Sequence, residues 1–402
     1  MVTVRTPRPR PGLRRGTRRE SGIVPVTVMT TVAPARAALA STSTACLSSE
    51  DPGDSRATEP LTAITGWGRH VPGRIVTNDE LAATLDTSDE WIQARTGIRE
   101  RRVASPGETT ATLATAAARA ALAVARLDPT ELDLVIVCSI TPDFGGMPSV
   151  ASIVQHALGA SRAGAFDLSA ACSGWVYGLG VANALAAAGT HRNILLVGAE
   201  TLSRFVDWTD RSTCVLFGDG AGAIVLQRTG PGGETTRSTG STALLSLVTG
   251  SDGGRGPALA IPAGGSLAPA SHATVDARSH FIAMDGREVY RFAITTVPLA
   301  CTRAVEQAGL TMADIDLVVL HQANVRIMST IIEALGLPWE RAFVNVDRYG
   351  NTSAASIPIA LAEAVEAGRL QPGHRVLVAG FGGGLTWGAA VLDWRGAPLA
   401  SP

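Results

Sequence analysis

The feature that most restricts how this 402-residue chain can fold is an internal repeat that keeps its order over four segments. The stretch AARAALAVARLDPTELDLVIVCSITPD resembles CTRAVEQAGLTMADIDLVVLHQANVRI, and each reads as a helix, a short loop and a buried strand. Three further pairs follow in order: AFDLSAACSG with AFVNVDRYGNTSAAS, RNILLVGAE with HRVLVAGF, and GDGAGAIVLQ with GGGLTWGAAVL. Asp133 and Asp316 occupy matching positions. The repeat predicts an α/β protein built from a duplicated unit.

Composition divides the chain into four regions. Residues 1–60 are rich in Pro, Arg, Ser and Thr without periodicity, which predicts a disordered extension; a transit peptide and an over-long gene start are the alternatives. Residues 61–228 and 281–402 are expected to form the two halves. Between them, residues 229–280 are rich in Gly, Ser and Thr and are expected to form a long connecting loop.

The charge balance and the residues used exclude several classes of protein. A net charge of −1 argues against a nucleic-acid partner, and no apolar run approaches the length that spans a membrane. The chain has no lysine, which excludes Schiff-base chemistry and a P-loop lysine. Its five cysteines fit neither a disulfide framework nor a zinc pattern, so we expect a reducing, cytoplasmic location and no metal site.

One cysteine stands at a predicted junction between a strand and a helix. In DLSAACSGW, Cys172 is surrounded by small residues and precedes an Ala- and Gly-rich helical stretch. A free cysteine is often only a small buried hydrophobe, so packing is one interpretation. The other is a nucleophile, because unpaired N–H groups at a helix N-terminus stabilise a thiolate.

The duplication places two more polar groups at comparable positions. His321 begins HQAN directly after the strand DLVVL, and Asn351 lies in GNTSAAS, which occupies the place of the Cys172 segment in the second half. Sheets of this kind gather functional groups at strand ends, so the three side chains are predicted to converge. Taken singly, His321 is also compatible with a structural histidine and Asn351 with a turn or helix cap.

These motifs together resemble one family. The Cys of AACSGW, the His of HQANVRI and the Asn of GNTSAAS are similar to the triad of the β-ketoacyl-acyl carrier protein synthase III family. The similarity runs from about residue 61 to residue 394 and includes TSDEWIQARTGIRERR, FGDGAGA, MDGREVYRFA and GFGGGLTWGAAVL. It implies a thiolase-like fold, in which two duplicated α/β halves form a layered α-β-α-β-α core.

The resemblance also implies a reaction, the condensation of a short acyl-CoA primer with malonyl-acyl carrier protein that initiates fatty-acid synthesis. The CoA thioester is a substrate, and no cofactor is implied. Cys172 would carry the acyl group, and His321 and Asn351 would donate hydrogen bonds to the enolate left by decarboxylation. The backbone N–H groups of Cys172 and Gly383 would form the oxyanion hole for the acyl carbon.

Further residues are assigned by the same resemblance. Those implied to bind coenzyme A are Trp91, Arg95, Arg211 and Asn324. Those implied to contact the carrier protein are Arg291 and Arg326, for which ordinary solvated arginines are the alternative. Those implied to line the acyl pocket are Met147, Leu202, Phe217 and Ile282. Met147 would reach the pocket from the second subunit of a homodimer, and its flexible side chain leaves the primer length open.

Several related activities are weighed against this one. A degradative thiolase uses a second cysteine near the C-terminus, and this chain has none after Cys301. A chalcone-synthase-like enzyme lacks the combination of HQANVRI with GFGGGLTWGA, and acyltransferases of secondary metabolism usually depart from the pattern at the His or Asn. A starter-unit ketosynthase of a polyketide pathway would share the chemistry, and the sequence leaves it open as the alternative.

Overall fold

The computed structural model describes residues 62–228 and 243–395, so the predicted extension over residues 1–60 lies outside the described residues. Two main sheets organise this part of the chain. The first has the strand order β1-β7-β6-β4-β5 and the second the order β11-β12-β13-β8. Their strands are β1 (Thr62–His70), β4 (Leu134–Cys138), β5 (Gly164–Leu168), β6 (Asn193–Thr201) and β7 (Asp219–Arg228), then β8 (Ala243–Ser251), β11 (Leu317–Leu320), β12 (Arg375–Gly382) and β13 (Thr386–Asp393).

Helices fill the layers around these sheets. They are α1 (Asn78–Ala82), α2 (Asp89–Thr96), α3 (Thr110–Ala125), α4 (Val150–Leu158), α5 (Gly174–Ala187), α6 (His272–Asp276), α7 (Gly286–Gln307), α8 (Val325–Ala334), α9 (Val346–Tyr349) and α10 (Ser356–Glu366). Two short strand pairs complete the description: β2 (Arg74–Thr77) with β3 (Glu100–Val103), and β9 (Leu259–Ala260) with β10 (Ala283–Met284).

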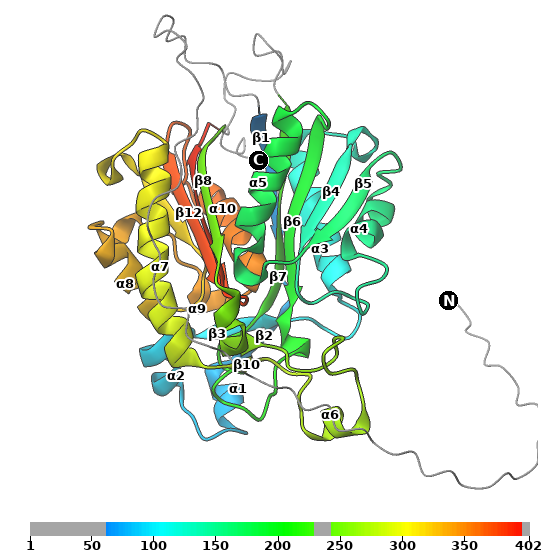
Figure 1. Ribbon diagram of the computed structural model, residues 1–402, viewed down its shortest axis with the longest axis vertical. Helices are drawn as coiled ribbons and strands as arrows, with labels where there is room; N and C mark the ends of the chain where they lie inside the picture. Colours follow the sequence, from blue (N-terminus) through cyan, green and yellow to red (C-terminus); the bar gives the residue numbers. More distant parts are fainter. Residues whose placement is uncertain (1–61, 229–242, 396–402) are drawn as a thin grey trace, which may run out of the picture. The chain divides into compact units, whose positions relative to one another are not determined.

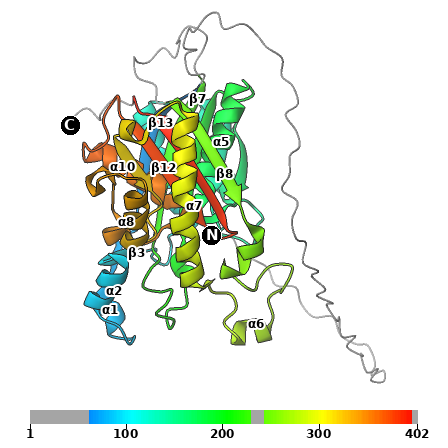
Figure 2. The ribbon, with the colours of Figure 1, turned by 60° about the vertical axis from the view of Figure 1, so that its left-hand side comes forward.

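Three apolar clusters show that the elements form five layers. One cluster joins α3 and α4 to the outer face of the first sheet, and another joins α7 and α8 to the outer face of the second. The third lies between the sheets and contains the buried faces of α5 and α10. Figure 1 shows these two helices between the sheets, and Figure 2 shows α7 across β8, β12 and β13. The expected α-β-α-β-α layering of a thiolase-like fold is confirmed.

The two halves repeat each other in hydrogen-bond detail. Strands β4 and β6 are parallel neighbours, as are β11 and β12. The carboxylate of Asp133 accepts hydrogen bonds from the N–H groups of Arg192 and Asn193, and that of Asp316 accepts one from the N–H of Arg375. Each aspartate thus ties the start of one parallel strand to the start of its neighbour, so the two matched sequence positions make matching hydrogen bonds.

Residues 229–242 of the expected connecting loop over 229–280 lie outside the described residues, and the remainder contains β9 and α6. The loop prediction is also wrong for residues 243–251. They form β8, which pairs antiparallel with β13 as β1 pairs with β7 in the first half. The second half therefore recruits its edge strand from the segment that precedes residue 281. This strand is half-exposed, and its sequence ALLSLVTGS has no regular alternation of apolar and polar residues, which is why its composition resembled a loop.

Each half places a tight turn before its central helix. Ala171 and Ser353 both have positive φ, +45° and +47°, and each begins a short 3₁₀ turn that leads into α5 or α10. Glycines make room for these turns. A Cβ on Gly198 would lie 2.2 Å from the carbonyl oxygen of Ala354, and one on Gly380 would lie 3.0 Å from that of Cys172. The strands of each half therefore support the turn of the other.

Candidate active site

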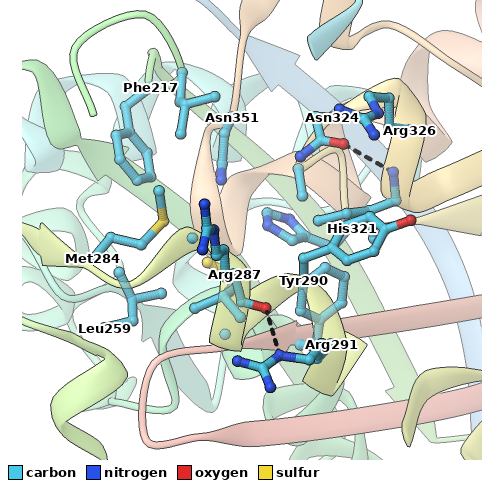
Figure 3. A pocket seen from close by; sticks show the side chains of 18 of the residues that line it. Phe217, Leu259, Met284, Arg287, Tyr290, Arg291, His321, Asn324, Arg326 and Asn351 are labelled. Atoms are coloured by element: carbon cyan, nitrogen blue, oxygen red, sulfur yellow. Dashed lines mark hydrogen bonds between the residues drawn. The ribbon is translucent and has the colours of Figure 1, made fainter. Parts of the chain in front are cut away.

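A cavity of about 700 Å³ opens where the two turns meet. The structure brings together around it the three side chains that the sequence singled out: Cys172 from the first half, and His321 and Asn351 from the second. Figure 3 shows His321, Asn351, Phe217, Met284 and Leu259 around this cavity. The duplicated fold therefore joins groups that are far apart in the sequence.

Cys172 lies in the 3₁₀ turn that precedes α5 and is 6% exposed. The backbone of Gly382 packs directly against it, because a Cβ there would lie 2.8 Å from the Cys172 nitrogen and 3.0 Å from Sγ. Burial raises the pKa of the thiol to about 12, and the nearby Ser353 hydroxyl acts in the opposite direction. The resting group is thus a neutral thiol, close to backbone N–H groups at the start of α5.

His321 follows β11 and is buried. Its Nδ1 lies 2.7 Å from the hydroxyl oxygen of Ser356, the first residue of α10. That oxygen also accepts a hydrogen bond from the N–H of Gln322 at 3.4 Å, so its own proton is available to Nδ1. Burial lowers the pKa of His321 to about 3, which keeps the imidazole neutral. When the Ser356 hydroxyl donates to Nδ1, the neutral ring carries its proton on Nε2.

Asn351 is fixed by its backbone and by its side-chain oxygen. Its N–H donates to the carbonyl oxygen of Leu216 at 2.8 Å, and its own carbonyl oxygen accepts from the N–H of Gly218 at 2.9 Å. The Oδ1 atom accepts a hydrogen bond from the N–H of Ser353 at 2.9 Å. Because Oδ1 is bonded in this way, the Nδ2 group is the part of the amide that can donate into the cavity (Figure 3).

Sequence reasoning missed a buried carboxyl near the thiol. Glu200, on β6, is fully buried and accepts hydrogen bonds from Ser139 Oγ at 3.1 Å and Thr141 Oγ1 at 2.5 Å. Burial raises its pKa to about 7. The Ser353 hydroxyl is buried without a hydrogen bond of good geometry, yet it lies near enough to Glu200 and Cys172 to lower the pKa of each. In the sequence, the segment VGAETLS that contains Glu200 indicates only a strand, and nothing in it marks Glu200 as a functional residue.

At the mouth of the cavity, Trp91 lies against two arginines. The guanidinium carbons of Arg95 and Arg211 are 4.6 and 5.2 Å from the centroid of its ring system, and Arg95 also lines the cavity. Asn324 caps α8, where its Oδ1 accepts a hydrogen bond from the N–H of Ile327 at 2.8 Å. The lining further includes the predicted Arg291 and Arg326, and two residues of α7 that sequence reasoning missed, Arg287 and Tyr290 (Figure 3).

The apolar wall differs from the expected one. Phe217 lines the cavity, together with Leu216, Leu259 and Met284. Leu202 and Ile282 belong to the same buried cluster as Phe217, but they are not among the lining residues. Met147 is 85% exposed and does not line the cavity of its own chain. Gly383 does not line it either; the neighbouring Gly382 does.

The described ranges, 62–228 and 243–395, contain neither a metal-binding cluster nor a membrane-spanning helix. No group of three or more His, Cys, Asp or Glu side chains there is arranged to hold a metal ion. No helix in these ranges is long and apolar enough to cross a membrane.

Comparisons with known proteins identify the relatives of this chain. The family model described as 3-oxoacyl-[acyl-carrier-protein (ACP)] synthase III matches residues 166–253, and the model of its C-terminal part matches residues 305–394. The chain is 50% identical over 332 residues to β-ketoacyl-[acyl-carrier-protein] synthase III of Roseiflexus sp. (strain RS-1), which covers 83% of this chain and 98% of the relative. The chain belongs to the β-ketoacyl-acyl carrier protein synthase III family.

Solved structures agree with membership of the synthase III family. The 3-oxoacyl-[acyl-carrier-protein] synthase III of Aquifex aeolicus VF5 is 44% identical, with a TM-score of 0.74 and coverage of 83% of this chain and 100% of that one. The priming β-ketosynthase of the R1128 polyketide pathway is 36% identical, with a TM-score of 0.75 and coverage of 86% and 100%. Identity to the R1128 enzyme is lower than identity to the Roseiflexus and Aquifex synthases, which does not favour the polyketide alternative. The chain is an acyltransferase-type condensing enzyme.

Proposed function

We propose that this chain condenses a short acyl-CoA primer with malonyl-acyl carrier protein and releases a 3-oxoacyl-acyl carrier protein that starts fatty-acid synthesis. One observation carries the proposal. In a member of the synthase III family, a single cavity is lined by Cys172, by a neutral His321 whose Nδ1 is bonded to Ser356, and by Asn351 whose Oδ1 is bonded to the N–H of Ser353.

The first half-reaction transfers the acyl group to Cys172. The sulfur loses its proton and attacks the thioester carbon, the bond to the CoA sulfur breaks, and the proton ends on the released CoA thiol. The N–H groups of Cys172 and Gly383 receive the oxygen of the tetrahedral intermediate. Gly382 supports this role of the loop, because its lack of a side chain lets the backbone approach the thiol.

The second half-reaction forms the new carbon–carbon bond. Malonyl on the carrier protein loses carbon dioxide, and the enolate attacks the acyl carbon of Cys172, whose sulfur leaves as thiolate. Negative charge develops on the thioester oxygen during decarboxylation. His321 Nε2–H and Asn351 Nδ2–H are donors fixed in advance toward that oxygen, and Ser356 and Ser353 hold their other polar atoms in place.

The substrate contacts are proposed from position and chemistry. Trp91 offers an aromatic face for the adenine of coenzyme A, Arg95 and Arg211 offer charge for its phosphates, and Asn324 faces the pantetheine arm. Arg291 and Arg326 lie where an acidic carrier protein would approach. The acyl chain would extend past Phe217 toward the cluster that contains Leu202 and Ile282.

A homodimer would complete the acyl pocket. Strand β5 is a half-exposed edge of the first sheet, with Phe166 37% exposed, and Met147 is 85% exposed. Exposed apolar side chains at a free strand edge favour pairing with a second copy. The cytoplasmic location expected from the cysteines stays a prediction.

The test is reconstitution from purified components. The chain, acetyl-CoA and malonyl-acyl carrier protein should together yield acetoacetyl-acyl carrier protein, detected by its mass. With acetyl-CoA alone, one acetyl group should appear on the peptide that contains Cys172, and Cys172→Ala should abolish both signals. Label on Cys138, Cys214 or Cys301 would contradict the assignment of the nucleophile.

A further inference from the structure

Arg101 is a buried cation that the proposed reaction does not use. It lies on β3 and is 0% exposed. Its guanidinium donates to the carbonyl oxygens of Val76 at 3.1 Å and Val215 at 3.0 Å, and to Asn78 Oδ1 at 2.8 Å. These three partners are all uncharged. Burial lowers the pKa of Arg101 to about 10, so it stays charged near neutral pH. A buried cation without a carboxylate partner is costly to the fold.

The partner Val215 begins the segment that holds Asn351. The next residue, Leu216, accepts the N–H of Asn351 at 2.8 Å, and Gly218 donates its N–H to the Asn351 carbonyl at 2.9 Å. Phe217 and Asn351 thus form an isolated parallel bridge. Leu216, Phe217 and Asn351 all line the cavity. The hydrogen bond from Arg101 to the Val215 carbonyl oxygen is therefore adjacent in the chain to the backbone hydrogen bonds that hold Asn351.

The side chain of Arg101 also packs against the turn before Asn351. A Cβ placed on Gly350 would lie 3.2 Å from the Arg101 Cβ and 2.8 Å from the Leu216 carbonyl oxygen. A Cβ on Gly218 would lie 3.3 Å from the Arg101 Cβ. Arg101 therefore lies close to both glycines that flank the bridge, Gly218 and Gly350, and it is not among the residues that line the cavity.

We infer that Arg101 is a positioning residue for condensation, which acts by holding the 215–218 segment and thereby the direction of the Asn351 amide. The inference rests on the role proposed above for Asn351. It predicts a selective defect. Loss of Arg101 disturbs the donor that stabilises the enolate, whereas the turn that carries Cys172 is supported by Gly380 and Gly382 and stays in place.

The test compares the two half-reactions in the Arg101→Lys variant, because lysine keeps the charge but lacks the planar guanidinium fork whose two nitrogens reach the three separate oxygens. Self-acylation of Cys172 is followed by mass, and condensation of the acylated enzyme with malonyl-acyl carrier protein is followed separately. We expect condensation to fall about ten- to a hundredfold, with self-acylation changed less than about threefold. In an Asn351→Ala background, the same change should lower condensation by less than about twofold, since the amide it positions is gone.

Arg341→Lys is the matched control. This arginine also holds two main-chain carbonyls, those of Ala313 at 3.1 Å and Ile315 at 2.6 Å, but it does not line the cavity. Its loss should leave the ratio of condensation to acylation unchanged. Equal losses in both half-reactions for Arg101→Lys, or an undiminished effect in the Asn351→Ala background, would overturn the inference. An Asn351→Ala variant with normal condensation would instead contradict the proposed function.

A second variant keeps the inference testable if Arg101→Lys does not fold. Gly350→Ala puts a methyl group between the Leu216 carbonyl and Arg101 and displaces the same turn from the other side. We expect the same selective loss of condensation. An unchanged ratio of the two half-reactions would show that this contact does not direct Asn351.

Discussion

At the scale of single residues, the site works through polar atoms that are already bonded on their far side. Ser356 holds Nδ1 of His321, and the N–H of Ser353 holds Oδ1 of Asn351, so each group presents one N–H to the cavity. Donors that are fixed before the charge develops lose little free energy to reorganisation. The thiol differs from these donors, because burial raises its pKa and keeps it neutral, and the nearby Ser353 hydroxyl acts against this effect.

Separate replacement of His321 and Asn351 by Ala should therefore distinguish the two half-reactions. Both residues are assigned to the enolate, so condensation should fall at least about a hundredfold, the usual effect of removing an oxyanion donor. Acylation of Cys172 should remain within a few-fold of the unchanged enzyme. Mass spectrometry of the acylated peptide, beside a condensation assay, measures both. Parallel losses would mean that the two donors serve acyl transfer as well.

The buried carboxyl of Glu200 should make the stability of the fold depend on pH. Its folded pKa of about 7 is above its ordinary 4.5, so between these values the unfolded chain has lost a proton that the folded chain keeps. Folding thus becomes less favourable as the pH rises through this window, by about 3 kcal/mol in total. Glu200→Gln removes the titration.

Urea unfolding of both proteins at pH 5 and pH 8 measures this effect. The free energy of unfolding of the unchanged chain should fall relative to that of Glu200→Gln between the two values. The other titrating groups are common to both proteins and cancel in the comparison. A constant difference between them would show that Glu200 does not hold a proton in the folded state.

At the scale of elements, the two turns before α5 and α10 depend on glycines of the opposite half. Gly198→Ala should destabilise the fold by about 1–3 kcal/mol, because the added Cβ meets the Ala354 carbonyl oxygen, a backbone atom that cannot swing away. Gly73→Ala is the control, since nothing lies within 4 Å of a Cβ at that position. Denaturant unfolding compares them. Equal stability of the two variants would contradict the described contact.

Much of this architecture could be predicted from the sequence because the repeat supplied it. Because the strands of the two halves match, Cys172 and the GNTSAAS segment were predicted at equivalent positions. The family resemblance supplied the order of the layers. The strand β8 could not be predicted in this way, since its edge position leaves it half-exposed and without a clear pattern. The burial of Arg101 could not be predicted for a related reason. In GIRERR it reads as one more surface charge, and only the tertiary structure decides that it is buried.

At the scale of the whole molecule, the proposed homodimer would bring Met147 of one subunit to the acyl pocket of the other. Met147→Phe should shorten the acyl pocket from across the interface, and so lower kcat/KM for longer or branched primers while sparing acetyl-CoA. Each methylene that no longer fits should cost about 1–3 kcal/mol of discrimination. Leu299→Phe is the control, because Leu299 is also exposed but lies on α7, away from the 147 position in the sequence. Acyl-CoA preference and the mass in solution are measured together. A monomer, or an unchanged preference, would remove Met147 from the site.

The reciprocal support between the two turns has a consequence for the history of the chain. Gly198 of the first half receives the Ala354 turn of the second, while Gly380 of the second receives the Cys172 turn of the first. Such an exchange, in which each partner gives the other the same contact, is the mark of an isologous twofold interface between identical subunits. The two halves are therefore related as the subunits of a dimer would be, a relation that duplication of one unit produces. The relation is not exact, because one copy of the turn carries a thiol at Cys172 and the other an alanine at Ala354.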